Sequence, residues 1–176
     1  DEASGAKYLT SLDLLKGFWQ VGLTKRAQEA SAFVTPDGHY EYCVMPFGMR
    51  NSSASFQNLA DQLVRGLEGV TAYIDDLLVC SNTWEEHMKR LRALFERLEE
   101  AKLTVNLDKC EFGASTVKYL GHRVGQGGIR PLEAKVADIV SFRAPRTRRG
   151  LRSYLGLVGF YRDFCPELCP SREPTN

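Results

Sequence analysis

The 176-residue sequence has no long hydrophobic run, an odd number of cysteines and almost no net charge. No stretch approaches the ~20 consecutive apolar residues that a membrane-spanning helix needs, and the opening Asp1-Glu2 is unlike the basic start of a signal peptide. The five cysteines lie mostly in apolar, strand-like runs, which favours reduced packing residues over a disulfide framework. We therefore expect an intracellular protein that neither enters a membrane nor is secreted.

The net charge of +1 conceals two halves of opposite sign. Residues 1–88 hold 6 Lys and Arg against 12 Asp and Glu, whereas residues 89–176 hold 17 against 10, so the halves carry −6 and +7. An acidic half suits a metal-using site, and a basic half suits a surface that holds a polyanion. The same split is compatible with two lobes that only attract each other.

Hydrophobic patterns predict a strand over residues 7–13, hairpins turning at 35–38 and 75–76, and further strands at 105–107 and 117–124. Residues 18–23 are expected to be extended. Helical spacing predicts helices over 52–66, 84–98, 133–142 and 148–164. The apolar face expected for the second helix consists of Trp84, Met88, Leu91, Leu94, Phe95 and Leu98. This order of elements predicts an α+β fold, with an antiparallel sheet and helices on one face.

Two adjacent aspartates, Asp75 and Asp76, lie between apolar runs, with no basic residue within five positions on either side. Like charges at a hairpin tip repel each other, so a divalent cation would stabilise them. A solvated acidic turn is the alternative, because carboxylates are common in turns. In an antiparallel sheet Asp13, at the end of the first strand, would lie beside this tip. Three converging carboxylates are what two-metal phosphoryl transfer needs.

Five motifs, in order, resemble the reverse transcriptases of gypsy-type LTR retrotransposons. Tyr-Ile-Asp-Asp at residues 73–76 is similar to the YxDD motif of that family, and residues 11–21 are similar to its first aspartate motif. Residues 45–57 resemble the segment between these two motifs. Residues 119–122 and 151–162 resemble the primer-contacting hairpin and the thumb. The resemblance extends from residue 6 to residue 168.

The resemblance implies a right-hand polymerase palm with truncated fingers and a partial helical thumb. Residues 1–124 would form the palm with partial fingers, residues 125–168 the primer-contacting turn and the start of the thumb, and residues 169–176 an irregular tail. The fingers are expected to be incomplete, since the resemblance begins at the first aspartate strand. Ala30-Ser31 and Ser53 also replace residues that are usual in the family.

The implied activity is RNA-directed DNA polymerase. A nucleotide would pass from a dNTP to a primer 3′-end on an RNA or DNA template, with Mg²⁺ or alternatively Mn²⁺ as cofactor. The implied partners are the template with its primer and the RNase H and integrase regions of a parent retrotransposon polyprotein. The implied location is a cytoplasmic particle or the nucleus.

The resemblance also assigns site residues position by position. Catalytic roles fall to Asp13, Asp75 and Asp76, which would bind metal together with the backbone carbonyl of Leu14. Nucleotide contact falls to Phe18, Phe47, Gly48 and Lys109. Nucleic-acid contact falls to Tyr73, Tyr119, Leu120, Gly121, Arg143, Arg146, Arg148, Arg149 and Arg152.

Several of these assignments have a plainer alternative. Phe18 would exclude a ribose 2′-hydroxyl by a steric clash, or it packs in the core. Lys109 would lie near the leaving phosphate, or it is simply a solvated lysine. The five arginines suit salt-dependent contacts to phosphates, or they form a solubilising turn. For the whole chain, the alternative to a polymerase fragment is a catalytically inactive remnant that binds nucleic acid or a protein partner.

Overall fold

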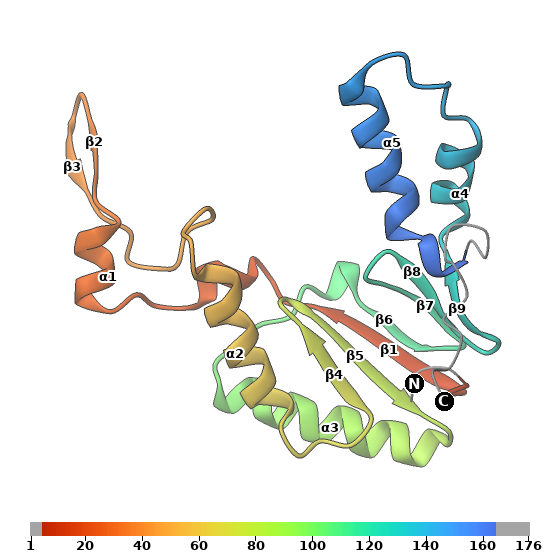
Figure 1. Cartoon of the computed structure of the whole chain (residues 1–176). Helices are drawn as coiled ribbons and strands as arrows, with labels where there is room; N and C mark the ends of the chain where they lie inside the picture. The colour runs from red at the N-terminus through yellow and green to blue at the C-terminus, as the bar shows by residue number, and fades with distance from the viewer. Residues whose placement is uncertain (1–4, 165–176) are drawn as a thin grey trace, which may run out of the picture.

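A four-stranded antiparallel sheet forms the centre of the computed structural model, which describes residues 5–164 (Figure 1). Its strand order is β4-β5-β1-β6. The strands are β1 (Tyr8–Asp13), β4 (Val70–Tyr73), β5 (Asp76–Ser81) and β6 (Glu111–Ala114). Strand β1 confirms the strand expected over residues 7–13, and every pairing in the sheet is antiparallel.

Two helices, α2 (Ser52–Val64) and α3 (Trp84–Glu100), cover one face of this sheet. The period-two alternation of β5 sends Leu77 and Val79 into the core beneath these helices. Leu78 and Cys80 project to the opposite face and join a second core. The α+β class and the placing of the helices on one face are therefore confirmed.

The second face is covered by a small antiparallel sheet of β7 (Thr116–Tyr119), β8 (His122–Gly125) and β9 (Gly128–Pro131). The single strand predicted over residues 117–124 is wrong, because the chain turns at Leu120 and Gly121. Both residues have positive φ, 47° and 77°, as the central residues of a type I′ turn require. Val117, Tyr119 and Val124 favour strands, and this pattern hid the turn.

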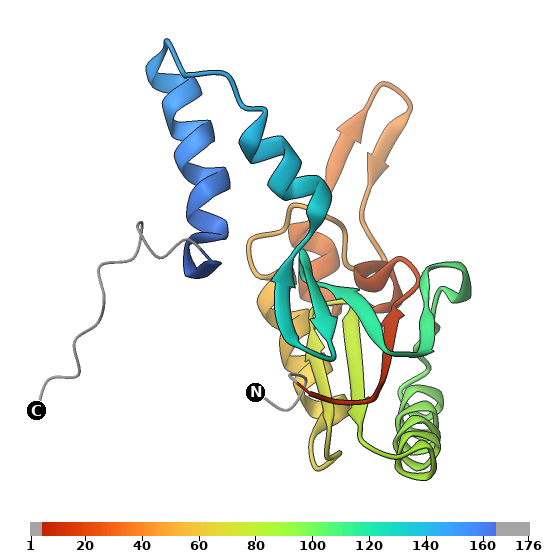
Figure 2. The same ribbon diagram turned by 90° about the vertical axis from the view of Figure 1, so that its right-hand side faces the viewer.

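Two smaller parts project from the packed sheets and helices (Figures 1 and 2). One contains α1 (Lys25–Ala30) and the hairpin of β2 (Phe33–Thr35) and β3 (Gly38–Tyr40). The other is the helical pair α4 (Glu133–Val140) and α5 (Arg148–Phe160), followed by the 3-10 turn η3 (Arg162–Phe164). The expected division between residues 124 and 125 falls inside β8. The expected tail at 169–176 lies outside the described residues.

Two local expectations differ from the structure, and one helix was not expected. Residues 18–23 are not extended throughout: a left-handed Lys16 (φ 53°) turns the chain into the 3-10 helix η1 (Gly17–Gln20), and extended backbone resumes only at Val21. Residues 105–107 are not a strand either, since Val105 makes only a bridge to Leu14, and η2 (Leu107–Lys109) follows. Helix α1 was missed because none of its residues is buried, which leaves no apolar period. Within residues 5–164 no helix has the length and apolarity to cross a membrane.

Candidate active site

The pairing of β1 with β5 places two aspartates opposite each other at one end of the sheet. Asp13 partners Asp76 in a register that begins with Tyr8 opposite Ser81. Directly paired residues of antiparallel strands project on the same face. The alternation of side chains puts both carboxylates on the face away from α2 and α3, the face that also carries Leu78.

Asp75 lies in the turn between β4 and β5. The turn consists of Ile74 and Asp75, one residue earlier than expected, because Tyr73 pairs with Asp76. Ile74 has a φ of 52°, a left-handed conformation that β-branched residues rarely adopt. The backbone amide of Leu14 donates a 2.9 Å hydrogen bond to the Asp75 carbonyl, which ties the turn to the end of β1.

The side chain of Gln57, in α2, hydrogen-bonds this turn from the face of the sheet that the helices cover. Its side-chain oxygen accepts a 2.7 Å hydrogen bond from the Ile74 amide, and its side-chain nitrogen donates a 3.1 Å hydrogen bond to the Ala72 carbonyl. One amide side chain therefore pairs with the backbone amide of the left-handed residue and with the carbonyl two residues before it. The position of Asp75 depends on α2 as well as on the sheet.

A cavity of about 350 Å³ opens beside these carboxylates and gathers six of the residues assigned from the sequence. Its lining consists of Asp13, Leu14, Leu15, Lys16, Gly17, Phe18, Phe47, Asp75, Asn106 and Lys109. Gly17 permits the close approach of the loop to the turn, because a Cβ at this position would lie 3.0 Å from the Asp75 Cβ. Asp76 and Gly48 do not line the cavity.

The three carboxylates are close enough to affect one another. The pKa of Asp76 is raised by burial and then by the charges of Asp75 and Asp13. The Lys109 Nζ lies 3.3 Å from the Asp13 Oδ2 and partly offsets this charge. Lys109 is well exposed, so this ion pair is worth little in stability.

Carboxylate and carbonyl oxygens are the donors that Mg²⁺ prefers, and the three aspartates with the Leu14 carbonyl provide such a set. In the part of the chain that the structure describes, no three His, Cys, Asp or Glu side chains converge as a ready metal site. Burial raises the Asp76 pKa and the charges of Asp75 and Asp13 raise it further, so a cation bound beside them would offset their mutual repulsion. The donor chemistry fits a divalent ion, and Lys109 would have to leave Asp13 when one binds.

Phe18 lies at the boundary between the cavity and the core. Its ring packs edge-on against Phe47 and Phe56, at centroid distances of 5.4 and 5.3 Å. Phe56 is buried, whereas Phe47 is 67% exposed. Phe18 thus has one side in the core and one in the cavity, so both alternatives for its role remain open.

The residues assigned to nucleic-acid contact form two groups. In the first group, Tyr73 ends β4, and Tyr119, Leu120 and Gly121 end β7 and form the β7–β8 turn. The pKa of Tyr119 is raised mainly by burial, opposed by a hydrogen bond with Thr71, with the Asp76 charge a further cause. The other group consists of Arg143, Arg146, Arg148, Arg149 and Arg152. These arginines are exposed in the α4–α5 connection and at the start of α5, the end of the helical pair that lies away from the four-stranded sheet (Figure 1). The structure does not bring them to the carboxylates.

Sequence reasoning missed the polar residues that fix the Asp13 loop. The Gln20 side chain donates to the carbonyls of Leu15 and Thr104, at 2.7 and 3.0 Å, and accepts from the Thr104 amide at 2.7 Å. The backbone amide of Asn106 donates a 2.8 Å hydrogen bond to the backbone carbonyl of Asp13. Apart from Leu15, these partners are more than eighty positions apart in the chain, so no local pattern reveals their contacts.

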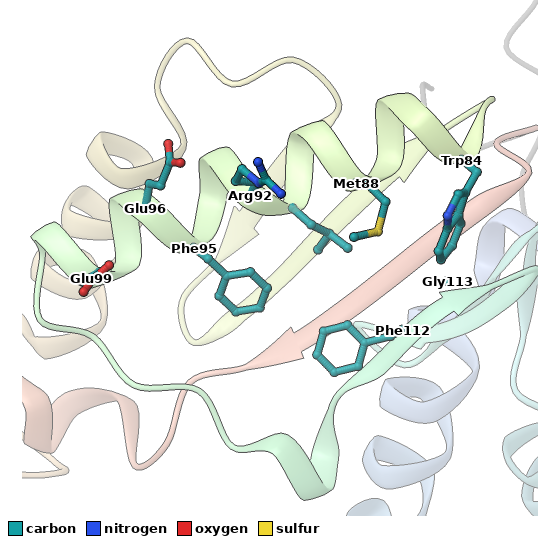
Figure 3. A pocket seen from close by; sticks show the side chains of 9 residues that line it. Trp84, Met88, Arg92, Phe95, Glu96, Glu99, Phe112 and Gly113 are labelled. Atoms are coloured by element: carbon teal, nitrogen blue, oxygen red, sulfur yellow. The ribbon is translucent and has the colours of Figure 1, made fainter.

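A larger groove, of about 510 Å³, lies between α3 and β6, away from the assigned residues (Figure 3). The sequence placed Trp84, Met88 and Phe95 on one face of α3 with the leucines. The structure instead directs Leu91, Leu94, Leu98 and His87 towards the sheet, and leaves Trp84, Met88 and Phe95 exposed along this groove. Phe112 of β6 forms the opposite wall.

An antiparallel sheet that is backed by two helices and carries paired aspartates beside a hairpin turn defines the palm of a nucleic-acid polymerase. Residues 1–124 match the family described as "Reverse transcriptase (RNA-dependent DNA polymerase)". The chain belongs to this family.

Two transposon polyproteins illustrate the similarity. The chain is 39% identical over 170 residues to the Retrovirus-related Pol polyprotein from transposon 297 of Drosophila melanogaster, covering 96% of the chain and 16% of that polyprotein. It is 31% identical over 174 residues to the Transposon Tf2-3 polyprotein of Schizosaccharomyces pombe, covering 98% of the chain and 13% of that protein. The chain therefore spans less than one fifth of the length of these relatives.

Two solved structures show the same fold. The foamy viral protease-reverse transcriptase in complex with double-stranded DNA has a TM-score of 0.87 and 32% identity, over 93% of this chain and 29% of that chain. The complex of foamy viral protease-reverse transcriptase with an RNA/DNA hybrid has a TM-score of 0.82 and 31% identity, over 92% of this chain and 22% of that chain.

Proposed function

We propose that the chain is the palm and partial thumb of an RNA-directed DNA polymerase from an LTR retrotransposon polyprotein. It would transfer a nucleotide from a dNTP to a primer 3′-end on an RNA or DNA template. The observation that carries this proposal is the pairing of Asp13 with Asp76 across β1 and β5, with Asp75 in the adjoining turn. The proposed division keeps residues 1–124 as palm with partial fingers and residues 125–168 as primer turn and thumb.

The proposed roles of the acidic residues follow from their positions. Asp13, Asp75 and the Leu14 carbonyl would hold divalent Mg²⁺ or Mn²⁺, and Asp76 would complete the acidic cluster. A bound ion of this kind neutralises the developing charge of the 3′-oxygen and of the pyrophosphate. Lys109, released from Asp13, remains on the cavity wall with its ammonium free to contact a phosphate of the nucleotide.

The proposed nucleotide site is the cavity itself. Phe18 and Phe47 would lie against the sugar and base, with Gly48 beside them in the adjoining loop. The left-handed φ of Gly48, 86°, suits a loop that approaches a ligand with its backbone.

The proposed nucleic-acid contacts are made by two surfaces. Tyr73, Tyr119 and the turn at residues 120–121 would contact the primer end. The five exposed arginines of the thumb would contact backbone phosphates, since within residues 5–164 none of them pairs with a carboxylate. The titles of the two foamy viral complexes name double-stranded DNA and an RNA/DNA hybrid, and we propose the same ligand types here.

The proposed setting is a polyprotein with RNase H and integrase regions. It would act inside the cell, in a cytoplasmic particle or in the nucleus. The similarity to two transposon polyproteins supports this setting.

Primer extension with dNTPs and Mg²⁺ tests the function, in this chain and in the full-length polyprotein that carries it. Asp75→Asn should reduce extension at least 100-fold, with unchanged thermal stability and template binding, because it removes one charge from a repelling cluster. Asp37→Asn, in the exposed β2–β3 hairpin, is the matched control and should extend normally. Near-normal extension by Asp75→Asn would remove Asp75 from the proposed site.

The Lys109 ion pair with Asp13 is the observation that favours the second candidate, an inactive remnant that binds nucleic acid or a protein partner. The same assay distinguishes the two. Template binding without extension by the full-length protein, in Mg²⁺ and in Mn²⁺, would establish the remnant.

A further inference from the structure

The end of helix α5 is fastened to the turn between β7 and β8. The Tyr161 hydroxyl donates a 2.9 Å hydrogen bond to the Gly121 carbonyl, across 40 positions of sequence. Tyr161 is 4% exposed and ends α5, where its own carbonyl accepts a hydrogen bond from the Phe164 amide. The contact therefore joins a fixed helix end to a tight turn.

Aromatic rings surround this hydrogen bond. The His122 ring stacks on Phe160 at 5.2 Å and meets Tyr161 edge-on at 5.5 Å, with Phe164 at 5.6 Å. A Cβ on Gly121 would lie 3.2 Å from the Phe160 ring, so the turn backbone approaches the helix end closely. His122, Phe160, Tyr161 and Phe164 together are called the aromatic clamp below.

The turn that the clamp contacts contains one strained residue. Leu120 and Gly121 are both left-handed, and a leucine in this conformation is strained. The His122 Nδ1 lies 2.9 Å from the Leu120 carbonyl, so the clamp contacts the backbone of both turn residues. On the other side, Tyr119 is bonded to Thr71 of β4, the strand that leads to the carboxylates.

We infer that Tyr161 is a positioning residue, which sets the place of the 120–121 turn and, through it, the place of a primer end in the active site. The part of this inference that concerns the primer end rests on the proposed function. The part that concerns the position of the turn rests on the contacts of Tyr161 and His122 alone. Movement of α5 would be transmitted to the turn through one hydrogen bond and a stacked imidazole. A correctly placed thumb helix would then be needed for a correctly placed primer 3′-end.

The test compares Tyr161→Phe with Tyr154→Phe in the 176-residue chain. Tyr161→Phe keeps the ring and removes only the hydroxyl. Tyr154 lies on the same helix, its ring packs on Phe142, and the same change serves as the control.

The first measurement is amide hydrogen exchange of the segment 118–124, which needs no nucleic acid. Exchange there should rise about fivefold in Tyr161→Phe, the effect of losing one hydrogen bond, and should stay unchanged in β4–β5 and in Tyr154→Phe.

The second measurement is fluorescence anisotropy with two labelled probes, an RNA/DNA hybrid with a recessed primer 3′-end and a blunt duplex of the same length. Tyr161→Phe should weaken binding of the recessed hybrid about fivefold and leave the blunt duplex unchanged. Unchanged exchange at 118–124 would overturn the positioning role. Raised exchange with equal loss for both probes, or with no loss for either, would overturn the link to the primer end. If the wild-type chain bound neither probe, the proposed function and the primer link would both fail, and the exchange result alone would decide whether Tyr161 sets the turn.

Discussion

At the scale of single residues, Ile74 has the most demanding conformation of the candidate site. A β-branched residue at positive φ costs about 1–3 kcal/mol, and the turn persists because the Gln57 side chain satisfies the Ile74 amide and the Ala72 carbonyl. The catalytic role proposed for Asp75 therefore depends on a side chain of α2 that does not line the cavity. The strain lies one position before the carboxylate that would bind metal.

Gln57→Leu should destabilise the protein by about 1–3 kcal/mol, because it leaves a half-buried amide and a carbonyl without partners. Urea unfolding measures this change. Gln28→Leu, which removes a single side-chain bond to the Leu23 carbonyl, is the control and should cost less. Equal effects of the two substitutions would show that Gln57 does not hold the turn.

Phe18→Val should raise ribonucleotide incorporation relative to deoxyribonucleotide incorporation, because the smaller side chain opens the cavity on the side of the sugar. The ratio of kcat/KM for the two nucleotides, in the full-length polyprotein, measures it. Phe18 also packs on Phe56, so a stability loss of about 1–3 kcal/mol is expected besides. An unchanged nucleotide ratio with this stability loss would make Phe18 a core residue only.

At the scale of elements, α3 is joined to the sheet by a buried polar contact as well as by leucines. His87 is fully buried, with its Nε2 2.7 Å from the Thr10 hydroxyl of β1 and its Nδ1 2.8 Å from the Ser81 hydroxyl of β5. Burial, and then the charge of Arg90, lower the His87 pKa below 6.5. The folded state thus binds a proton less readily than the unfolded state.

The free energy of unfolding should therefore be constant above the ordinary histidine pKa of 6.5 and fall as the pH drops below it towards the lowered folded pKa. Urea unfolding between pH 5 and pH 8 measures this dependence. His87→Gln should lower stability overall and remove this part of the slope, whereas His39→Gln, in the exposed hairpin, should leave the slope intact. A slope retained in His87→Gln would contradict the assignment.

Elements were predictable from the sequence where local chemistry and tertiary contacts agree. Helix α3 was predicted correctly, because it has a capping residue and a strong apolar period. Its capping residue is Thr83, whose side-chain oxygen accepts a hydrogen bond from the Glu86 backbone amide. The residue pattern did not reveal the break at Leu120, because leucine rarely adopts the left-handed conformation, and only the resemblance of residues 119–122 to a hairpin implied it. The strand of Asp13 and the hairpin of Asp75 were predictable from alternation. The one-residue shift of the turn was not, since pairing with β1 decides it.

The candidate site was predictable to the same extent. The residue pattern pointed to Asp13 and Asp75, and the resemblance to the family added Phe18, Phe47 and Lys109, which line the same cavity. The supports from Gln20, Gln57 and Asn106 were not predictable, because each depends on hydrogen bonds to backbone groups that only the fold brings near.

At the scale of the whole molecule, acidic and basic surfaces are separated by the length of the thumb. The carboxylates lie at the end of the palm sheet, and the five arginines lie around the far end of the α4–α5 pair (Figure 1). A nucleic acid that contacts both regions would pass along the thumb and over the aromatic clamp. Phosphate contacts by the arginines, at the far end of the α4–α5 pair, would then support a primer end held beside the aromatic clamp.

Replacing Arg148 and Arg152 with Gln should weaken duplex binding and reduce the slope of log K against log salt by about 1–2, since each phosphate contact contributes ~0.9. Anisotropy titrations at several salt concentrations measure this slope. Lys89→Gln with Arg92→Gln removes equal charge from the exposed side of α3 and should leave the slope unchanged. Equal effects of the two double variants would indicate attraction by total charge without a thumb contact.

The pairing of β1 with β5 also limits how the gene can change in length. Because side chains alternate with a period of two, one added or deleted residue between Tyr8 and Asp13 would turn either the leucines or the aspartate to the wrong face of the sheet. Substitutions in β1 can preserve both the core and the carboxylate, but single-codon insertions and deletions cannot. Copies of the retrotransposon that drift in sequence would keep the length of β1 for as long as they keep a working palm.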